Sequence, residues 1–383
     1  LFPLGAVVQS VQLDVSGSMS KEATAQGEEG KKESQGLSQL DIVVHAMRTI
    51  IAACGDDDIL SIVTYSTCAS TDLPPMKMTK QGKKAAGKAL DNMSPNGQTN
   101  LWGGLKMGLD VLETIRDSRN NTHSNGAVLL MTDGVPNIIP PRGHVATLQK
   151  YISKHPNPRR AIHTFGFGYQ LQSDLLCDIA DIGNGAYAFI PDGGLVGTVF
   201  VHAASNLLAA QSSSATCTIE AKDGAKIKSV VGFPKATEDG PCARVTVNMG
   251  PLLYGQAKSL VVVVEKEEKT NVADVVSMHI NTATGKLTGD WRAPCKEGSF
   301  ALEAIMRAMA VSGILEAVSV GKAKGGEIDV AAAKKVVESM IEEGKKLVGE
   351  GGSSSSKSKF LQALLEDLEG QVATAVSKEE YFK

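Results

Sequence analysis

The sequence has few aromatic residues and no excess of charge of either sign. Aromatic residues make up 4% of the 383 positions, which argues against the base-stacking surfaces that bind single-stranded nucleic acids. Lys and Arg number 39 against 42 Asp and Glu, for a net charge of −3. Neither nucleic acid nor an anionic membrane is therefore an expected partner.

Clustered cysteines are also missing. The six cysteines form no C-x-x-C pair and no group with histidine, so the spacings of zinc sites, including those of ubiquitin-ligase RING modules, are absent. Their irregular spacing in a long chain favours reduced thiols in an intracellular, cytoplasmic protein. The chain starts at Leu1, without a signal-peptide pattern and almost directly on a strand-like run, so we expect a fragment or a processed segment.

Catalytic motifs are absent as well. None of the seven histidines lies in an H-E-x-x-H or a Cys/His context, and no G-x-S-x-G, G-x-G-x-x-G or complete phosphate-binding G-x-x-x-x-G-K-[ST] occurs. We therefore expect no enzyme, with hydrolysis at a lone metal as the alternative. The longest uncharged stretch, Gly193–Ile219, has apolar residues at helical spacing but includes His202, Ser205 and Asn206. It predicts a helix packed on a sheet, not the run of about 20 apolar residues that spans a membrane.

The most informative feature that is present is Asp14-Val-Ser16-Gly-Ser18. It follows the strand-like run Val7–Leu13, so one carboxylate and two hydroxyls lie where a strand ends and a turn begins. Such oxygen ligands suit a hard divalent cation. The alternative is a polar turn that only caps the next helix.

Two later runs supply further oxygen ligands. Thr99 lies in a polar loop before the helix-like Leu101–Thr114, and Asp133 follows the buried strand Gly126–Met131. In a doubly wound sheet, ligands bind outside the carboxyl ends of the strands at the switch point. We therefore predict a metal site formed by Asp14, Ser16, Ser18, Thr99 and Asp133, with Mg²⁺ as the cation and Mn²⁺ or Ca²⁺ as alternatives. For Thr99, capping of the following helix is the alternative role.

The order of elements predicts three regions. Up to about residue 205, strand-like and helix-like runs alternate, which predicts an α/β fold with a mostly parallel sheet and helices on both faces. Asp72–Met78 is expected to be an antiparallel edge. From about 211, β-type runs follow one another without helices and predict a small antiparallel sheet or sandwich. Three helical runs, Ser299–Val318, Ile328–Val348 and Phe360–Val376, come last, with Gly351–Lys357 as a flexible linker.

The run D-x-S-G-S-M, the Thr loop and the T-D-G strand end together resemble a von Willebrand factor type A domain. The resemblance covers residues 1 to about 205. It implies a Rossmann-like, doubly wound fold and a metal-ion-dependent adhesion site at Asp14, Ser16, Ser18, Thr99 and Asp133. In that family the hydroxyls bind the metal directly or through water, the aspartates act largely through water, and a partner carboxylate often completes the shell.

A second resemblance is narrower. The loop Met131–His144, and the residues from about 211 to Lys383, resemble eukaryotic proteins that join this domain to a hedgehog/intein-like module. It implies that self-processing chemistry lies elsewhere, since no His here is followed by Asn. We predict three domains: a von Willebrand factor A domain at 1–208, a small β domain at 211–292 and a helical region at 296–383.

Two loops near the predicted site have open roles. The connection Ser20–Gln39 is longer than the family pattern and rich in Glu and Lys. It predicts a solvated, disordered loop, or else a segment that overhangs the metal and supplies a Glu as an internal ligand or gate. Pro140–His144 either shapes the rim of the site, where Arg142 meets an acidic partner, or simply stiffens the entry to the next helix.

These observations favour metal-dependent binding of a protein that offers an Asp or Glu. The alternative is a structural or assembly subunit that oligomerises through its C-terminal helices, with the metal only stabilising loops. Ala332, Val336, Val337, Met340 and Ile341 give one of those helices an apolar stripe, which fits either an oligomer interface or an intramolecular core.

Overall fold

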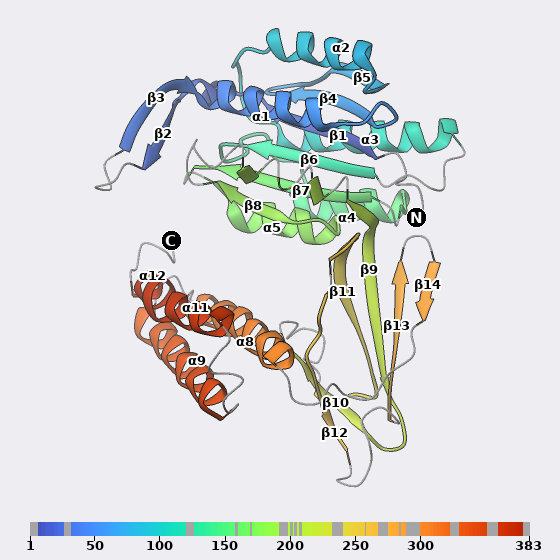
Figure 1. Cartoon of the computed structure of the whole chain (residues 1–383). Coiled ribbons are helices and arrows are strands. Elements are labelled where there is room, and N and C mark those ends of the chain that lie inside the picture. The colour runs from blue at the N-terminus through green and yellow to red at the C-terminus, as the bar shows by residue number, and fades with distance from the viewer. Residues whose placement is uncertain are drawn as a thin grey trace. The chain divides into compact units, whose positions relative to one another are not determined.

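Figure 1 shows a computed structural model of the chain. It describes residues 7–26, 32–119, 126–157, 160–168, 171–190, 198–199, 202, 205–206, 209–231, 240–256, 258–266, 275–282, 285–288, 299–321, 329–350 and 359–377. The predicted linker Gly351–Lys357 and most of the helix predicted within Gly193–Ile219 lie outside these ranges.

A six-stranded sheet in the order β5-β4-β1-β6-β7-β8 forms the centre of the N-terminal region. All neighbours are parallel except β5, which pairs antiparallel with β4 at the edge as predicted. After β4 and β5 on one side of β1, the chain crosses to β6 on the other side, so the switch point lies between β1 and β6. The strands are β1 Val8–Asp14, β4 Ile59–Tyr65, β5 Ala69–Lys77, β6 Gly126–Thr132, β7 Arg160–Phe167 and β8 Tyr187–Ile190.

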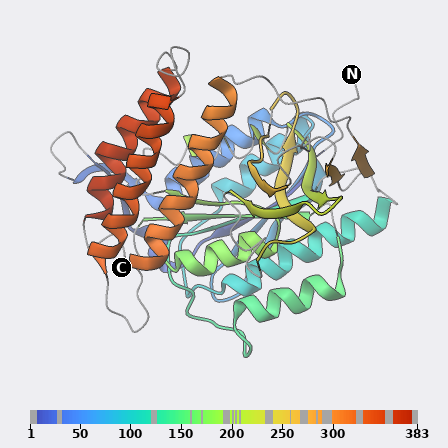
Figure 2. The same cartoon turned by 90° about the horizontal axis from the view of Figure 1, so that it is seen from below.

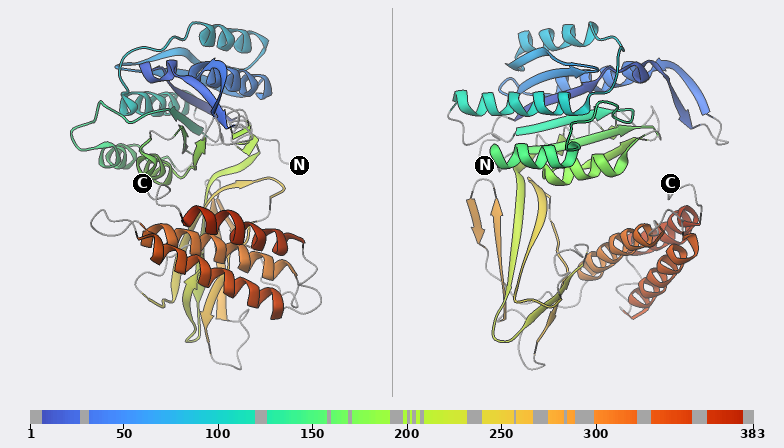
Figure 3. Two further views of the ribbon diagram at one scale, coloured as in Figure 1. Left: turned by 90° about the vertical axis from the view of Figure 1, so that its left-hand side faces the viewer. Right: turned by 180° about the vertical axis from the view of Figure 1, so that it is seen from behind.

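Helices cover both faces of this sheet, as the alternation predicted (Figures 1 and 3). Alternate residues of β1 and β6 face opposite sides: Leu13 and Met131 belong to one core cluster, Val8 and Leu130 to the other. The first cluster includes α1 (Gln39–Ala53) and α2 (Lys80–Asp91). The second includes α3 (Leu101–Arg119), α4 (His144–Lys154) and α5 (Ser173–Ile182).

Small residues let α3 approach the sheet closely. A Cβ on Gly104 would lie 2.4 Å from the Tyr65 ring, and one on Gly108 would lie 2.0 Å from the Gln12 side chain. A Cβ atom this close to another side chain would clash, so glycine at both positions lets α3 pack directly against β1 and β4. This fixes the start of α3 beside the switch point.

The described residues of the connection after β1, 15–26 and 32–38, form regular structure, which corrects the prediction of disorder for this part of Ser20–Gln39. Its described residues form a 3₁₀ turn, η1 (Gly17–Ser20), and an antiparallel hairpin of β2 (Glu22–Gln26) and β3 (Lys32–Ser38). The hairpin ends in a capping box: the Ser38 hydroxyl accepts from the Asp41 amide at 3.1 Å, and the Asp41 carboxylate accepts from the Ser38 amide at 2.8 Å. Backbone pairing and this cap hold the hairpin, whose one described side chain in the core cluster is the small Ala23, so the sequence lacks the alternating large apolar residues that would predict these strands.

Two further sheets follow, as the β-type runs predicted. They comprise a four-stranded sheet in the order β11-β9-β13-β14 and a two-stranded pair, β10-β12. β9 begins earlier than expected, and its alternate residues Ala215, Cys217 and Ile219 are buried. The strands are β9 Ala210–Ala221, β10 Lys226–Val230, β11 Arg244–Leu253, β12 Val262–Glu265, β13 Val276–Thr282 and β14 Gly285–Thr288, of which β14 was not predicted.

Helices α8 (Ser299–Gly321) and α9 (Val330–Glu350) contact each other and the segment α11 (Lys359–Asp367), η3 (Leu368–Val372) and α12 (Ala373–Val376) (Figures 2 and 3). The apolar stripe predicted on α9 is largely intramolecular core, since Val337, Met340 and Ile341 are buried in this cluster. By length and composition, Leu302–Gly321 within α8 also qualifies as a membrane-crossing helix, with 22% of its most apolar window buried. This segment differs from Gly193–Ile219, the longest uncharged stretch of the sequence.

The chain divides into two compact units. The first contains 1–216, 248–256 and 282–285, and the second contains 217–247, 257–281 and 286–383. The three domains expected at 1–208, 211–292 and 296–383 stay a prediction.

Candidate metal site at the carboxyl edge of the sheet

Asp14 is the last residue of β1 and is fully buried. Its Oδ1 accepts from the Ser16 amide at 2.8 Å, and its Oδ2 accepts from the Thr132 hydroxyl at 2.7 Å. Burial is the largest cause that raises its pKa, to about 6, and the neighbouring Asp133 contributes in the same direction. An anionic Asp14 therefore costs free energy at neutral pH.

Ser16 and Ser18 lie on the turn that follows. The turn is anchored by the fully buried Met19 and closed by the Met19 amide donating to the Ser16 carbonyl at 3.0 Å. The two hydroxyl oxygens are 3.1 Å apart, and the Ser18 hydroxyl donates to Asp133 Oδ1 at 2.7 Å. Residues from the ends of β1 and β6 thus meet across the switch point.

The second carboxyl group of the cluster is Asp133. Its Oδ2 is buried and has no hydrogen-bond partner among the described residues. Burial is the main cause that raises its pKa, while the charge of nearby Lys21 acts in the opposite direction. A buried oxygen that lacks a donor is unfavourable, and a bound cation would satisfy it.

The Thr99 loop joins the same edge. The Asn96 amide donates to the Val15 carbonyl at 2.7 Å, and the Gly17 amide donates to the Gly97 carbonyl at 3.2 Å. Thr99 itself is buried, and its amide donates to Asn137 Oδ1 at 2.7 Å. All five predicted ligand residues therefore come from loops that contact one another at the carboxyl edge.

Sequence reasoning missed three residues that position this cluster. Thr132 fixes Asp14, and Asn137 fixes Thr99. Tyr65, fully buried at the end of β4, donates its hydroxyl to the Met131 carbonyl at 2.5 Å. Thr132 stands directly before Asp133 and could have been found from that position, whereas the roles of Tyr65 and Asn137 depend on contacts across the fold.

The donor set fits a divalent cation. Two carboxyl groups and three hydroxyls offer oxygen ligands with limited protein charge, as Mg²⁺ prefers. Within the described residues, no group of three His, Cys, Asp or Glu is gathered elsewhere as an alternative metal centre. The arrangement contains no imidazole or thiolate that would favour a softer metal.

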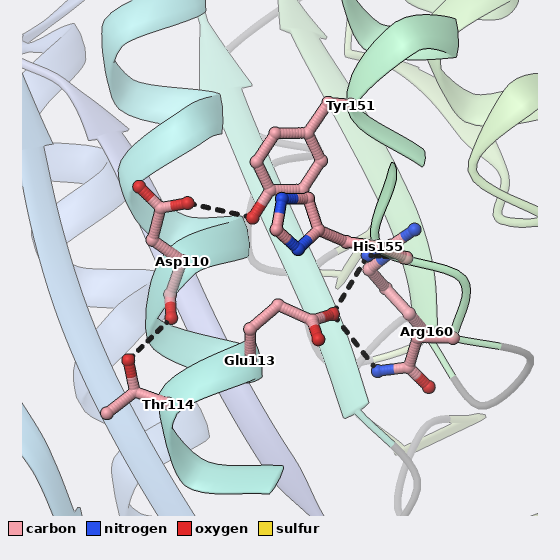
Figure 4. Close-up of polar contacts among 7 residues, drawn as sticks. Asp110, Glu113, Thr114, Tyr151, His155 and Arg160 are labelled. Carbon is pink, nitrogen blue, oxygen red and sulfur yellow. Dashed lines mark hydrogen bonds and ion pairs between the residues drawn. The ribbon is translucent and has the colours of Figure 1, made fainter. Parts of the chain in front are cut away.

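A second polar cluster lies at the amino-terminal edge of the sheet (Figure 4). Arg160, at the start of β7, donates to Glu113 Oε1 of α3 at 3.0 Å, and both side chains are almost fully buried. Arg160 also donates to the His155 carbonyl at 3.3 Å. The Tyr151 hydroxyl donates to Asp110 at 2.8 Å, and its ring stacks on His155 with centroids 4.6 Å apart. This cluster joins α3, α4 and β7 without needing an added ion.

Comparison with known proteins agrees with this architecture. Residues 11–135 match the family model of the von Willebrand factor type A domain. A solved structure described as von Willebrand factor type A from Catenulispora acidiphila aligns with a TM-score of 0.61 over 94% of this chain and 82% of its own, at 16% identity. At that identity the likeness concerns the fold alone.

Two curated plant proteins are also similar over a shorter stretch. The E3 ubiquitin-protein ligase WAV3 of Arabidopsis thaliana is 37% identical over 98 residues, and the probable E3 ubiquitin-protein ligase WAVH2 of the same plant is 29% identical over 106. These alignments cover 25% and 26% of this chain but only 13% and 14% of the plant proteins. The family-model match over residues 11–135 and the likeness to the solved structure agree that the N-terminal part of this chain has the fold of a von Willebrand factor type A domain.

Proposed function

We propose that this chain binds a protein partner through a divalent cation held at the carboxyl edge of the sheet. Asp14, Ser16, Ser18, Thr99 and Asp133 would hold the cation, and a partner Asp or Glu would complete its coordination. The supporting observation is the Asp14–Asp133 cluster: two carboxyl groups with raised pKa, one of which has a buried oxygen without a donor. Mg²⁺ is the proposed cation, with Mn²⁺ and Ca²⁺ as alternatives.

Calorimetric titration with MgCl₂ tests the cation. We expect binding by the wild type, no measurable binding by Asp14→Ala, and unchanged binding by the control Asp57→Ala, which removes an exposed carboxylate at a distant salt bridge with Lys77. A cation present at 100 times its Kd would also raise the free energy of unfolding by about 2.7 kcal/mol. Equal Mg²⁺ affinities for wild type and Asp14→Ala would remove the basis of the proposal.

The role is proposed to be binding, not catalysis. The plant relatives are named ubiquitin ligases, which suggests that this domain captures proteins for such enzymes. A ubiquitin-transfer assay with this chain, expected to give no conjugates, tests the non-enzymatic assignment. Two further predictions stay open to test. One is the likeness of the loop 131–144 and of the residues beyond 211 to hedgehog/intein-like proteins. The other is the intracellular location, which imaging of the tagged chain would test.

A second candidate is an assembly function of the C-terminal helices. Val311, Leu315 and Val318 of α8 recur at helical spacing, and 51%, 52% and 38% of their surfaces are exposed. Such a face fits self-association. Sedimentation with Mg²⁺ and with EDTA separates the candidates: a metal-independent oligomer that Leu315→Glu dissolves supports assembly, whereas a monomer under both conditions counts against it.

A further inference from the structure

Two large apolar side chains flank the candidate metal site. Val135 and Ile139 follow Asp133 on the loop between β6 and α4, and 47% and 62% of their surfaces are exposed. Since Val135 is two residues from Asp133, their Cα atoms lie within about 7 Å of each other. A lone exposed apolar residue needs no explanation, but two on one short loop beside a ligand cluster form a potential contact surface.

This loop is held in place independently of any partner. The Asn137 and Ile138 amides donate to the Thr99 carbonyl at 3.2 and 3.3 Å, and Asn137 accepts from the Thr99 amide at 2.7 Å. Pro136, between the anchor and Val135, is buried. The Gly143 amide donates to the Pro140 carbonyl at 2.8 Å, which closes a turn at the far end. An anchored loop loses little conformational entropy on binding, so its exposed side chains can contribute to affinity.

The rim of the site also carries positive charge. Lys21 is exposed and close enough to Asp133 to lower its pKa, and Arg142 is exposed at the end of the same loop as Ile139. A third exposed apolar side chain, Leu37, precedes the end of β3, where the Gln39 amide donates to the Lys21 carbonyl at 3.0 Å. Lys21 and Val135 therefore lie beside Asp133, and Leu37, Ile139 and Arg142 belong to the same two segments, a combination of apolar and basic groups that suits an acidic ligand with an apolar body.

We propose that the 134–143 loop recognises the residues next to the partner's metal-binding carboxylate. The fitting partner is a protein segment in which an Asp or Glu is flanked by large aliphatic or aromatic side chains. The carboxylate would complete the cation's coordination while its neighbours cover Val135 and Ile139. This inference rests on the proposed function and adds the sequence preference that the cation alone does not provide.

Selection from a displayed library of random peptides tests the preference. The full chain is immobilised with Mg²⁺, and bound peptides are eluted with EDTA and sequenced. We expect peptides with an acidic residue next to Ile, Leu, Val or Phe, and at least tenfold weaker binding of a selected peptide to the Val135→Ser/Ile139→Ser variant. Removing the contacts of two aliphatic side chains supports an effect of this size. The control Val263→Ser, which removes an exposed apolar side chain on β12, should bind like the wild type.

Calorimetry with MgCl₂ separates the two proposals. The inference requires that Val135→Ser/Ile139→Ser keeps the wild-type affinity for Mg²⁺ while losing affinity for the peptide. If the wild type binds no Mg²⁺, the proposed function fails. If Mg²⁺ binds but the eluted peptides show no apolar preference, or the variant binds them equally well, only this inference is overturned. Mg²⁺-dependent self-association that the variant abolishes would also overturn it, because the occupant would then be a second copy.

Discussion

Both ends of the six-stranded sheet bury carboxyl groups, but they compensate the charge differently. At the amino-terminal edge, Glu113 lies against the guanidinium of Arg160 at 3.0 Å. At the carboxyl edge, Asp133 lies close enough to Asp14 to disfavour ionisation of Asp14, and the hydrogen bonds that the two carboxyl groups accept come from an amide and from hydroxyls. The first arrangement carries its own counter-ion, whereas the second would, under the proposed function, gain its compensation from a bound cation.

The contrast separates stability from function within one sheet. A buried ion pair mainly penalises the loss of one partner, because an uncompensated charge then remains in the interior. A buried carboxyl cluster that lacks a counter-ion reduces stability until a ligand binds, which is a common property of binding sites. If mutations at the two edges change the free energy of unfolding in opposite directions, the amino edge serves stability and the carboxyl edge serves binding.

The largest effect is expected from breaking the amino-edge pair. Arg160→Met should lower the free energy of unfolding by about 3–5 kcal/mol, because the Glu113 carboxylate would stay buried without its counter-ion. Urea denaturation measures this change. The double variant Glu113→Leu/Arg160→Met is the control: it removes both charges and should recover most of the loss. A single variant as stable as the wild type would mean that the pair is not buried as described.

The next effect concerns His163, which lies in β7 between the two edges. Burial lowers its pKa to about 4, and its Nδ1 accepts from the Ala186 amide at 3.3 Å. Below pH 6.5 the unfolded chain takes up a proton at this position, whereas the folded chain stays neutral until about pH 4. Stability contributed by neutral His163 is therefore present above pH 6.5 and is lost as the pH falls to 4, by up to about 3 kcal/mol.

The variant His163→Gln isolates this group, because glutamine keeps an acceptor but does not titrate. Urea denaturation at several pH values should show a shallower loss of stability between pH 6.5 and 4 than in the wild type. Identical pH profiles would show that His163 is protonated in the folded chain at higher pH than its burial implies.

How much the sequence predicts differs between these regions. The alternating elements predicted the α/β sheet, and the position of Asp14 and Asp133 at strand ends predicted that their loops would meet. The pairing of Arg160 with Glu113 was not predictable, because 47 positions separate them and neither lies in a recognisable motif. Contacts of this kind depend on the register between α3 and β7, which no local pattern determines.

Two other regions show why local patterns fail. The sequences of β2 and β3 contain no large apolar residue except Leu37, so they lack the alternation of large apolar and polar residues that reveals a half-buried strand. In α8, apolar residues occur around most of the helix, so periodicity did not separate the buried Met306, Ala310 and Ala317 from the exposed Val311 and Leu315. The metal-binding role of the five predicted residues stays a prediction, although the fold brings their loops together.

The smallest effect, and the one of opposite sign, is expected at the carboxyl edge. Asp14→Asn removes a buried group whose charged form is unfavourable, while an amide oxygen can still accept one of the two hydrogen bonds that Asp14 receives. At pH 7 without metal, we expect the free energy of unfolding to rise by about 1 kcal/mol, less than the full pKa shift implies because one hydrogen bond is weakened.

Without metal, Asp14→Asn is expected to have a higher free energy of unfolding than the wild type. Adding Mg²⁺ should reverse this ranking, since the cation stabilises only the protein that binds it. The wild type would then become more stable than Asp14→Asn, and EDTA would restore the original ranking. Asp57→Asn, at an exposed carboxylate, controls for the loss of a charge alone and should respond to Mg²⁺ like the wild type. If Asp14→Asn destabilises the metal-free chain as Arg160→Met does, then Asp14 is a structural residue and the two edges do not differ in kind.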